Sequence, residues 1–238
     1  MKNPKVVILC GGKGVRLKPL TDDIPKPLIE MGGKPILHQA IDLYSKRGFN
    51  DFILCIGYKG YLIKEYFSKF PEYNIEYSDS GEDATMIKRI NDIKDLVDDK
   101  IIVAYGDTYA YINFNELLSS HNNENALMTM VTNSIKSPFG LIDINDKKIT
   151  NFKEKPTLNY YIGYSIIEKE AFNHITKDLL KAVGEEGWTL FFKKIIEMKK
   201  MGAYNHEGLN ITFNTHSQKK VSDNIFKYYT DWKPEDEE

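Results

Sequence analysis

Short apolar runs alternate with amphipathic stretches along the first 110 residues of the chain. Four apolar runs are typical of buried strands, namely Val6–Cys10, Phe52–Ile56, Ile75–Tyr77 and Ile101–Tyr105. Between them, apolar residues at helical spacing predict helices over Pro35–Arg47, Tyr61–Phe70 and Ile87–Val97. This alternation predicts right-handed crossovers and a parallel sheet with helices on both faces.

The second half of the chain has a different pattern, with longer strands and a hairpin. We expect strands at Leu127–Thr132, Tyr160–Ile167 and Ile211–Asn214, and a hairpin of Gly140–Ile144 and Ile149–Lys153 around a turn at Asn145-Asp146. Helices are expected at Phe114–Asn122, Lys169–His174, Trp188–Lys200 and Gln218–Trp232, before a solvated acidic end at Glu235–Glu238. No linker rich in Pro, Gly or Ser separates the halves. Residues 1–238 are therefore predicted to form one α/β domain, a Rossmann-like α/β/α fold with a mostly parallel mixed sheet.

The composition excludes some classes of function. A net charge of −2 over 238 residues argues against a nucleic-acid partner, which would favour a basic excess. No apolar run has the length of a membrane span, so no membrane partner is expected. Cys10 and Cys55 lie inside apolar runs and are predicted to be buried free thiols, which fits a cytoplasmic location.

Glycines follow the first predicted strand at positions 11, 12 and 14. Without Cβ atoms, their backbone N–H groups can face one small concavity that suits phosphate oxygens. Arg16 and Lys26 add positive charge nearby. The dinucleotide fingerprint is incomplete, since Leu17 stands where the third glycine belongs, and no Gly-Lys-Ser or Gly-Lys-Thr of a Walker motif follows. A plain surface turn is the alternative for this loop.

Two further charged residues stand at positions that favour chemistry. Lys26 lies between Pro25 and Pro27, which predicts an extended backbone that presents one rigid side chain. Asp107 follows a buried strand and Gly106, at the carboxyl edge where α/β sheets bind ligands. A carboxylate there suits Mg²⁺, although it can also simply cap the next turn.

A third group, Glu154-Lys155-Pro156, follows the predicted hairpin and contains another lysine before a proline. The alternative is that these residues form a solvated charged turn. Together with the glycine loop, Lys26 and Asp107, this third group makes up a set of groups suited to phosphoryl transfer.

These motifs occur in an order that resembles the sugar-phosphate nucleotidylyltransferase family. They are Gly11-Gly12-x-Gly14-x-Arg16-Leu17, Pro25-Lys26-Pro27, Gly33-Lys34-Pro35, Tyr105-Gly106-Asp107 and Glu154-Lys155-Pro156. The segment Asp51–Tyr61 and the run Ile87-Lys88-Arg89-Ile90 are most similar to the glucose-1-phosphate cytidylyltransferase branch. The resemblance is dense up to about residue 115. It implies a GT-A-like fold, with a nucleotide-binding half over about 1–115 and an acceptor-binding half over about 116–238.

The resemblance implies that an acceptor phosphate attacks the α-phosphorus of CTP and that pyrophosphate leaves. Arg16, Lys26 and Asp107 take the catalytic roles, and Mg²⁺ is the expected cofactor, bound by Asp107 and Asn214. The nucleotide-binding residues it implies are Leu9, Cys10, Gly11, Gly12, Lys13, Gly14, Val15, Arg16, Lys26, Ser80, Gly81, Lys88 and Gly106. Glu154, Lys155, Gly163 and Tyr164 are implied for the acceptor.

The chain departs from the family pattern at three places. Val15 replaces a threonine, and Asn214 stands where a second metal-binding aspartate is usual. The short segment 157–164 keeps only Gly163 of an Asn-Gly-Gly that contacts sugar hydroxyls in hexose-specific members. A pocket without those groups favours another acceptor.

We therefore expect a non-hexose phosphate of the phosphocholine or phosphoglutamine type, used in cell-surface polysaccharide or capsule modification. Tyr160, Tyr161, Tyr164 and Trp188 are candidates for a cage around a quaternary ammonium, or for core residues. The first alternative is an enzyme that uses a sugar 1-phosphate as the acceptor and makes a nucleotide sugar, as glucose-1-phosphate cytidylyltransferase does. The second alternative is an inactive nucleotide-binding regulatory homologue. The oligomeric state is left open between monomer and homodimer.

Overall fold

A computed structural model describes residues 3–231 of the chain. The predicted end of the last helix at Trp232 and the acidic end Glu235–Glu238 lie outside the described residues.

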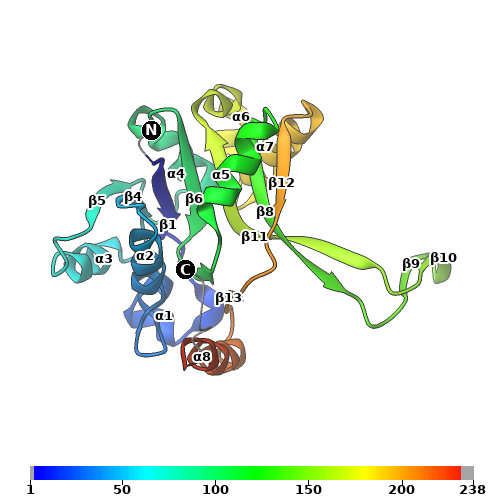
Figure 1. Ribbon diagram of the computed structural model, residues 1–238, viewed down its shortest axis with the longest axis horizontal. Helices are drawn as coiled ribbons and strands as arrows, with labels where there is room; N and C mark the ends of the chain where they lie inside the picture. Colours follow the sequence, from blue (N-terminus) through cyan, green and yellow to red (C-terminus); the bar gives the residue numbers. More distant parts are fainter. Residues whose placement is uncertain (1–2, 232–238) are drawn as a thin grey trace.

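A seven-stranded sheet forms the centre of the molecule (Figure 1). Its order is β12 (Met201–Asn205), β8 (Met128–Lys136), β11 (Thr157–Glu168), β6 (Lys100–Tyr105), β1 (Lys5–Leu9), β4 (Asp51–Ile56) and β5 (Asn74–Asp79). Neighbouring strands are parallel except that β11 is antiparallel to both β6 and β8. The predicted mixed, mostly parallel α/β fold is confirmed, and β6 and β11 join the two halves in one sheet.

Strand β1 shows why the sheet is buried on both faces. Val6 and Ile8 belong to one hydrophobic cluster, while Val7 between them belongs to the other, and all three are fully buried. Because side chains alternate along a strand, an unbroken apolar run requires cover on both sides. The first cluster also contains Leu37 and the second contains Ile90, each from a helix that supplies this cover.

The main helices between residues 3 and 231 are α2 (Ile36–Lys46), α3 (Gly60–Phe67), α4 (Met86–Asp92), α5 (Phe114–Asn123), α6 (Lys177–Lys181), α7 (Glu186–Glu197) and α8 (His216–Asp231), with a short α1 (Leu20–Asp23). The 3₁₀ turns are η1 (Val15–Leu17), η2 (Lys26–Leu28), η3 (Lys94–Leu96) and η4 (Lys169–His174). The single helix expected over Ile87–Val97 is wrong. The helix ends at Asp92 and is followed by η3, and this tighter turn leaves both Ile93 and Val97 buried.

Four short strands escaped prediction. They are β12 at the sheet edge, β7 (Thr108–Ala110), and the pair β2 (Glu30–Met31) and β3 (Lys34–Pro35). The strand expected at Ile211–Asn214 is present as β13 (Asn210–Thr212), which pairs with β7. Runs of two to five residues carry too little periodicity to be recognised in a sequence. The β7–β13 pair matters for the site, because it brings residues 210–214 beside Asp107.

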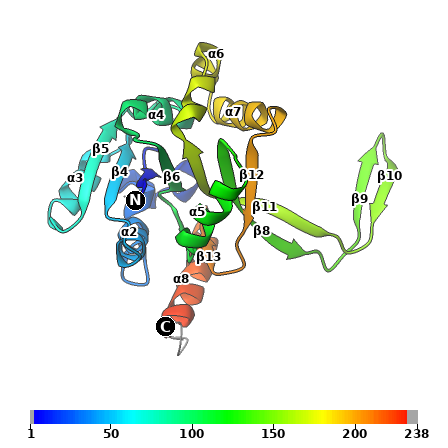
Figure 2. The same cartoon turned by 45° about the horizontal axis from the view of Figure 1, so that its top comes forward.

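A two-stranded arm, residues 137–156, leaves the body of the molecule beyond β8 and β11 (Figures 1 and 2). It contains β9 (Leu141–Asn145) and β10 (Lys148–Lys153). The turn lies at Asp146-Lys147, one residue later than predicted, because Asn145 already pairs with Lys148. Both turn residues have positive φ, 47° and 65°, as a two-residue hairpin loop of type I′ requires.

Candidate active site

A cavity of about 580 Å³ opens at the carboxyl ends of β1 and β6. Both halves of the chain line it, as expected for a ligand site of an α/β sheet. The lining residues from the first half include the loop Leu9–Leu17, Lys26, Pro27, Ala84, Met86, Arg89, Tyr105, Asp107 and Thr108. Those from the second half are Tyr160, Tyr161, Ile162, Gly163, Glu185, Asn210, Thr212 and Asn214.

The glycine loop is held by backbone contacts to the strands and turns around it. The Cys10 N–H donates to the carbonyl of Cys55, and the Tyr58 N–H donates to the carbonyl of Gly11. Burial raises the pKa of the Cys10 thiol well above its usual value, so this cysteine is a neutral wall residue. The loop therefore offers a fixed backbone surface without a side-chain nucleophile.

Arg89, on α4, is the main residue of the site that the sequence reasoning did not assign. Its buried guanidinium donates to the carbonyls of Ile56, Gly11 and Gly81, the last two at 3.2 and 2.8 Å. A Cβ at position 11 would overlap this guanidinium, so only glycine fits there. Burial lowers the pKa of Arg89 from its ordinary value. The sequence did contain a signal for a buried Arg89. Position 89 is three residues after Met86 and four before Ile93, so it lies on the same face of the helix as these apolar residues.

Lys26, Asp107 and Asn214 meet at the floor of the cavity. The Lys26 ammonium donates to Asp107 Oδ2 at 2.5 Å and to Asn214 Oδ1 at 3.0 Å. Only 8% of the Lys26 side chain is exposed, against 29% for Asp107. The prediction of an extended backbone at Lys26 is wrong, since this residue begins the 3₁₀ turn η2 and only Pro25 is extended. Three residues far apart in the sequence thus form one charged cluster.

Two other cations stand at the mouth of the cavity. Arg16 is exposed, and no hydrogen bond or ion pair holds it within the described residues. Lys13 donates to Asp83 at 2.7 Å, and this hydrogen bond raises the pKa of Lys13. Val15 lines the cavity with 60% of its surface exposed. Arg16 is consequently free to bind an anion, whereas Lys13 is already paired.

Four predicted nucleotide-binding residues do not line the cavity. Ser80 and Lys88 both bind Asp92, at 2.7 and 2.5 Å. Gly81 accepts the hydrogen bond from Arg89, and Gly106 lies close to Cys10 and Pro27 beneath the floor. These residues support or border the glycine loop, and their direct contact with a nucleotide stays a prediction.

Strand β11 forms the opposite wall and is irregular beside the cavity. Its register with β8 shifts between Tyr161 and Ser165, and Gly163 in this bulge has a φ of 87°. A Cβ there would come within 2.9 Å of the Tyr105 ring. Tyr105 and Tyr161 meet edge to face with ring centroids 6.0 Å apart. This wall is aromatic and carries one carboxylate, that of Glu185.

The other predicted acceptor residues do not line the cavity. Glu154 and Lys155 form a 3.9 Å ion pair at the root of the arm, with the Lys155 side chain 59% exposed, and neither lines the cavity. Tyr164 is fully buried, and its hydroxyl joins Tyr44 and the carbonyl of Thr108, each at 3.0 Å. Their roles toward an acceptor stay predictions.

The four aromatic residues considered for a cage do not come together. Tyr164 belongs to the core, and Trp188 is buried against Phe192, with ring centroids 4.6 Å apart. Only Tyr160 and Tyr161 line the cavity. Of the two interpretations of these residues, Tyr164 and Trp188 follow the one that makes them core residues.

The donor set at the cavity floor fits a cation. Asp107 Oδ2 and Asn214 Oδ1 already converge on one positive centre, the Lys26 ammonium. Oxygen ligands of this kind suit Mg²⁺, which is held by few protein groups together with phosphates and water. Among the described residues, no group of three or more His, Cys, Asp or Glu side chains could hold a metal without such help. The same part of the chain contains no helix long and apolar enough to cross a membrane.

Comparison with known proteins identifies the class of protein. The model of the nucleotidyl transferase family matches residues 5–226. The chain belongs to this family.

Individual relatives agree with that assignment. The chain is 33% identical over 241 residues to the "Probable glucose-1-phosphate cytidylyltransferase" of Bacillus subtilis, covering 89% of this chain and 92% of that one. It is 32% identical over 177 residues to glucose-1-phosphate cytidylyltransferase of Salmonella typhimurium, covering 64% and 69%. The crystal structure of HddC from Yersinia pseudotuberculosis has the same fold, with a TM-score of 0.70 at 22% identity over 94% of this chain and all of that one. The chain is an enzyme of the nucleotidyltransferase class.

Proposed function

We propose that the protein is a cytidylyltransferase that transfers CMP from CTP onto the phosphate of a sugar 1-phosphate, with glucose 1-phosphate as the first candidate. The observation that carries the proposal is the Lys26–Asp107–Asn214 cluster on the floor of a cavity whose rim is the glycine loop. The similarity to cytidylyltransferases supports CTP as the donor and glucose 1-phosphate as the acceptor.

The reaction needs no covalent intermediate. An oxygen of the acceptor phosphate, ionised at neutral pH, forms a new bond to the α-phosphorus of CTP while the bond to pyrophosphate breaks. Mg²⁺, when bound by Asp107 and Asn214, would neutralise part of the negative charge on the phosphates. The Lys26 ammonium is placed to bind an oxygen of the α-phosphate, and Arg16 to bind the leaving pyrophosphate. Catalysis by this chain is then positioning and charge stabilisation in a partly buried site.

The acceptor is the point at which this proposal departs from the expectation of a non-hexose phosphate. That expectation relied on the short segment 157–164. The aromatic cage considered for a quaternary ammonium loses two of its four candidates, because Tyr164 and Trp188 are core residues. The relatives favour the sugar 1-phosphate alternative instead. Phosphocholine and phosphoglutamine remain as competing acceptors for the experiment.

The test is a matrix of CTP, UTP, ATP and GTP against glucose 1-phosphate, phosphocholine and phosphoglutamine, with pyrophosphate release measured in Mg²⁺. We expect release to be fastest with CTP and glucose 1-phosphate. Faster release with another acceptor would replace the proposed acceptor but keep the reaction class. Tight CTP binding without release for any acceptor would favour a regulatory homologue.

Lys26→Met provides the matched test of the mechanism, because it keeps the length of the side chain and removes its charge. We expect a loss of kcat of at least 10³-fold, equivalent to about 4 kcal/mol. Lys59→Met, at a half-buried lysine outside the cavity that donates to the carbonyl of Asp23, is the control and should retain activity. An unchanged kcat in Lys26→Met would remove this lysine from the mechanism.

A further inference from the structure

Glu185 is a carboxylate of the cavity that the reaction steps at the floor do not use. Among the described residues that the second half of the chain contributes to the cavity, it is the only one with a charge. The residue is exposed, and its side chain does not cap the helix α7 that it precedes. No hydrogen bond or ion pair holds the carboxylate within residues 3–231. Glu185 is therefore available to a ligand.

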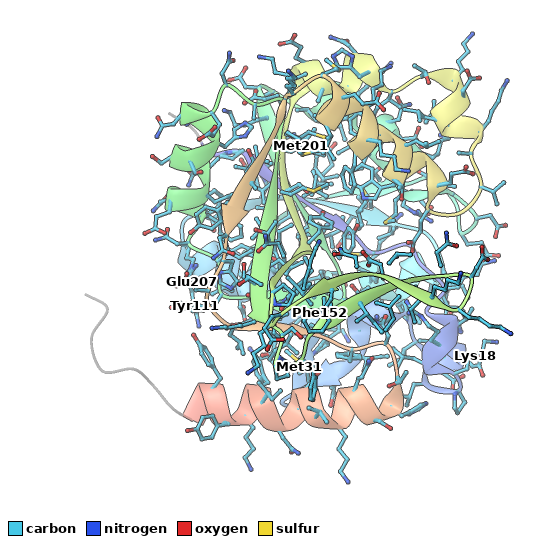
Figure 3. The ribbon with its side chains drawn as sticks, turned by 90° about the vertical axis from the view of Figure 1, so that its right-hand side faces the viewer. Lys18, Met31, Tyr111, Phe152, Met201 and Glu207 are labelled. Atoms are coloured by element: carbon cyan, nitrogen blue, oxygen red, sulfur yellow. The ribbon has the colours of Figure 1, made fainter. Side chains whose placement is uncertain are left out.

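The first turn of α7 fixes the position of Glu185. Its carbonyl accepts a hydrogen bond from the Thr189 N–H at 3.0 Å. A Cβ at Gly187 would overlap the carbonyl oxygen of Leu179, so this turn packs directly on α6. The far end of α7 leads into the edge strand β12, whose first residue, Met201, is labelled in Figure 3. Glu185 thus belongs to an element that is held at both ends.

Tyr105 connects Glu185 with the floor of the cavity. Trp188, one turn after Glu185, is buried and donates its indole N–H to the Tyr105 hydroxyl at 3.1 Å. Burial raises the pKa of Tyr105, and the negative charges of Glu185 and Asp107 act in the same direction. Both carboxylates are therefore within electrostatic reach of one hydroxyl, Asp107 from the floor and Glu185 from the wall.

The other polar side chains on this side of the cavity are neutral, and most are bound within the chain. The Tyr161 hydroxyl shares a hydrogen bond with Ser165 at 2.9 Å, and Thr212 donates to a backbone carbonyl at 3.2 Å. Asn210 turns its amide oxygen into the protein, where no donor of the described residues reaches it. Hydrogen bonds to an ionised group are roughly twice as strong as neutral ones. Glu185 is consequently the group of this wall with the greatest effect on a ligand.

The proposed acceptor has two ends with different chemistry. Its phosphate has to reach the α-phosphorus of CTP at the floor, and a carboxylate repels that phosphate. Its hydroxyl groups are hydrogen-bond donors, and an ionised carboxylate accepts hydrogen bonds at both oxygens. Glu185 therefore suits the hydroxyl end and orients the acceptor with its phosphate toward the floor.

We propose that the Glu185 carboxylate accepts hydrogen bonds from hydroxyl groups of the sugar 1-phosphate and is a specificity-determining residue for the acceptor. This assignment rests on the proposed function, and it names the group through which the sugar is recognised.

The experiment compares wild type with Glu185→Ala and Glu186→Ala by steady-state pyrophosphate release with CTP and Mg²⁺. Glu186 is an exposed glutamate at the next position that does not line the cavity, so its variant is the matched control. The acceptors are glucose 1-phosphate, its analogues in which fluorine replaces the hydroxyl at C2, C3, C4 or C6, and phosphocholine. Because fluorine cannot donate a hydrogen bond, each analogue removes one donor.

We expect Glu185→Ala to lower kcat/KM for glucose 1-phosphate by about 30-fold with an unchanged KM for CTP, and Glu186→Ala to behave as wild type. In wild type, at least one fluorinated analogue should react about 20-fold more slowly than glucose 1-phosphate. In Glu185→Ala, the same analogue should lose less than about threefold, because the carboxylate that bound the missing hydroxyl is already absent.

Equal kcat/KM values for Glu185→Ala and Glu186→Ala would overturn the assignment and leave the proposed function intact. Equal losses for every analogue in wild type and Glu185→Ala would do the same. Wild type that releases no pyrophosphate with glucose 1-phosphate would overturn the proposed function and this assignment together. Wild type that prefers phosphocholine, with that preference lost in Glu185→Ala, would overturn the assignment in favour of an ammonium group as the partner of this carboxylate.

Discussion

The two walls of the cavity are built differently. The first wall is the loop after β1, which is held by backbone contacts and by the buried Arg89 and adjoins Lys26 and Asp107 on the floor. The second wall is a bulged stretch of β11, next to which the strand continues into an exposed arm. Most residues predicted for the nucleotide line the first wall, whereas only Gly163 of the four predicted for the acceptor lines the second.

The difference follows from the geometry of the two kinds of strand. The ends of parallel strands meet at one edge of the sheet, so a residue after β1 and a residue after β6 are close whatever lies between them. An antiparallel strand with a bulge gives no such rule, because each extra residue reverses the face on which the following side chains lie. The nucleotide side of such a fold is therefore easier to infer than the acceptor side.

The largest effect is expected at the first wall, from Asp107→Ala. This change removes the carboxylate that faces Lys26 and the predicted metal site, so kcat/KM should fall by at least 10³-fold, or about 4 kcal/mol. Pyrophosphate release with CTP and glucose 1-phosphate measures it. Asp95→Ala, at an exposed aspartate in η3, is the control. Activity near that of wild type in Asp107→Ala would locate the metal site elsewhere.

Arg89→Lys tests what makes the first wall rigid. An ammonium cannot reproduce the fork of donors that reaches three carbonyls, so we expect a loss of about 3 kcal/mol in the free energy of unfolding. For a chain of this size, the Tm should then fall by roughly 6–12 °C. Thermal unfolding followed by circular dichroism measures it, with the exposed Arg16→Lys as the control. Equal Tm values in the two variants would contradict the role given to Arg89.

A smaller effect is expected at the arm root, from Lys155→Ala. Its side chain is 59% exposed and outside the cavity, so solvent screens its charge. We expect kcat/KM for the acceptor to fall by about tenfold, or about 1.4 kcal/mol, while the KM for CTP is unchanged. Steady-state kinetics with each substrate varied in turn separates the two. Lys153→Ala, on the adjacent strand β10, is the control. A loss as large as that of Asp107→Ala would make the arm root as important for activity as the cavity floor.

The smallest effect is expected from Asn214→Asp. A second carboxylate beside Asp107 adds charge to the predicted metal site, so the Mg²⁺ concentration that gives half-maximal activity should fall a few-fold. Asn214→Ser is the control, since it removes the amide oxygen without adding charge and should raise that concentration. The same Mg²⁺ dependence in all three proteins would exclude Asn214 as a ligand.

Much of the fold and part of the site could be predicted from the sequence. The apolar runs of β1, β4 and β6 are unambiguous because they are buried on both faces. Lys26 and Asp107 could be grouped from their sequence contexts, but Asn214, which is 188 residues from Lys26, could be added only from a family resemblance. Arg89 escaped because its partners are backbone carbonyls, which no residue type reveals. The position of the hairpin turn also depends on backbone hydrogen bonds, because the pairing of Asn145 with Lys148 places the turn one residue later than predicted.

The contacts of Arg89 have a consequence for how the enzyme can move. One guanidinium binds carbonyls at Gly11, Ile56 and Gly81, at the carboxyl ends of β1, β4 and β5. Opening any one of these segments alone would leave a buried charge short of a partner, which is costly. The three segments therefore open together or not at all, and in hydrogen exchange their amides should share one opening free energy.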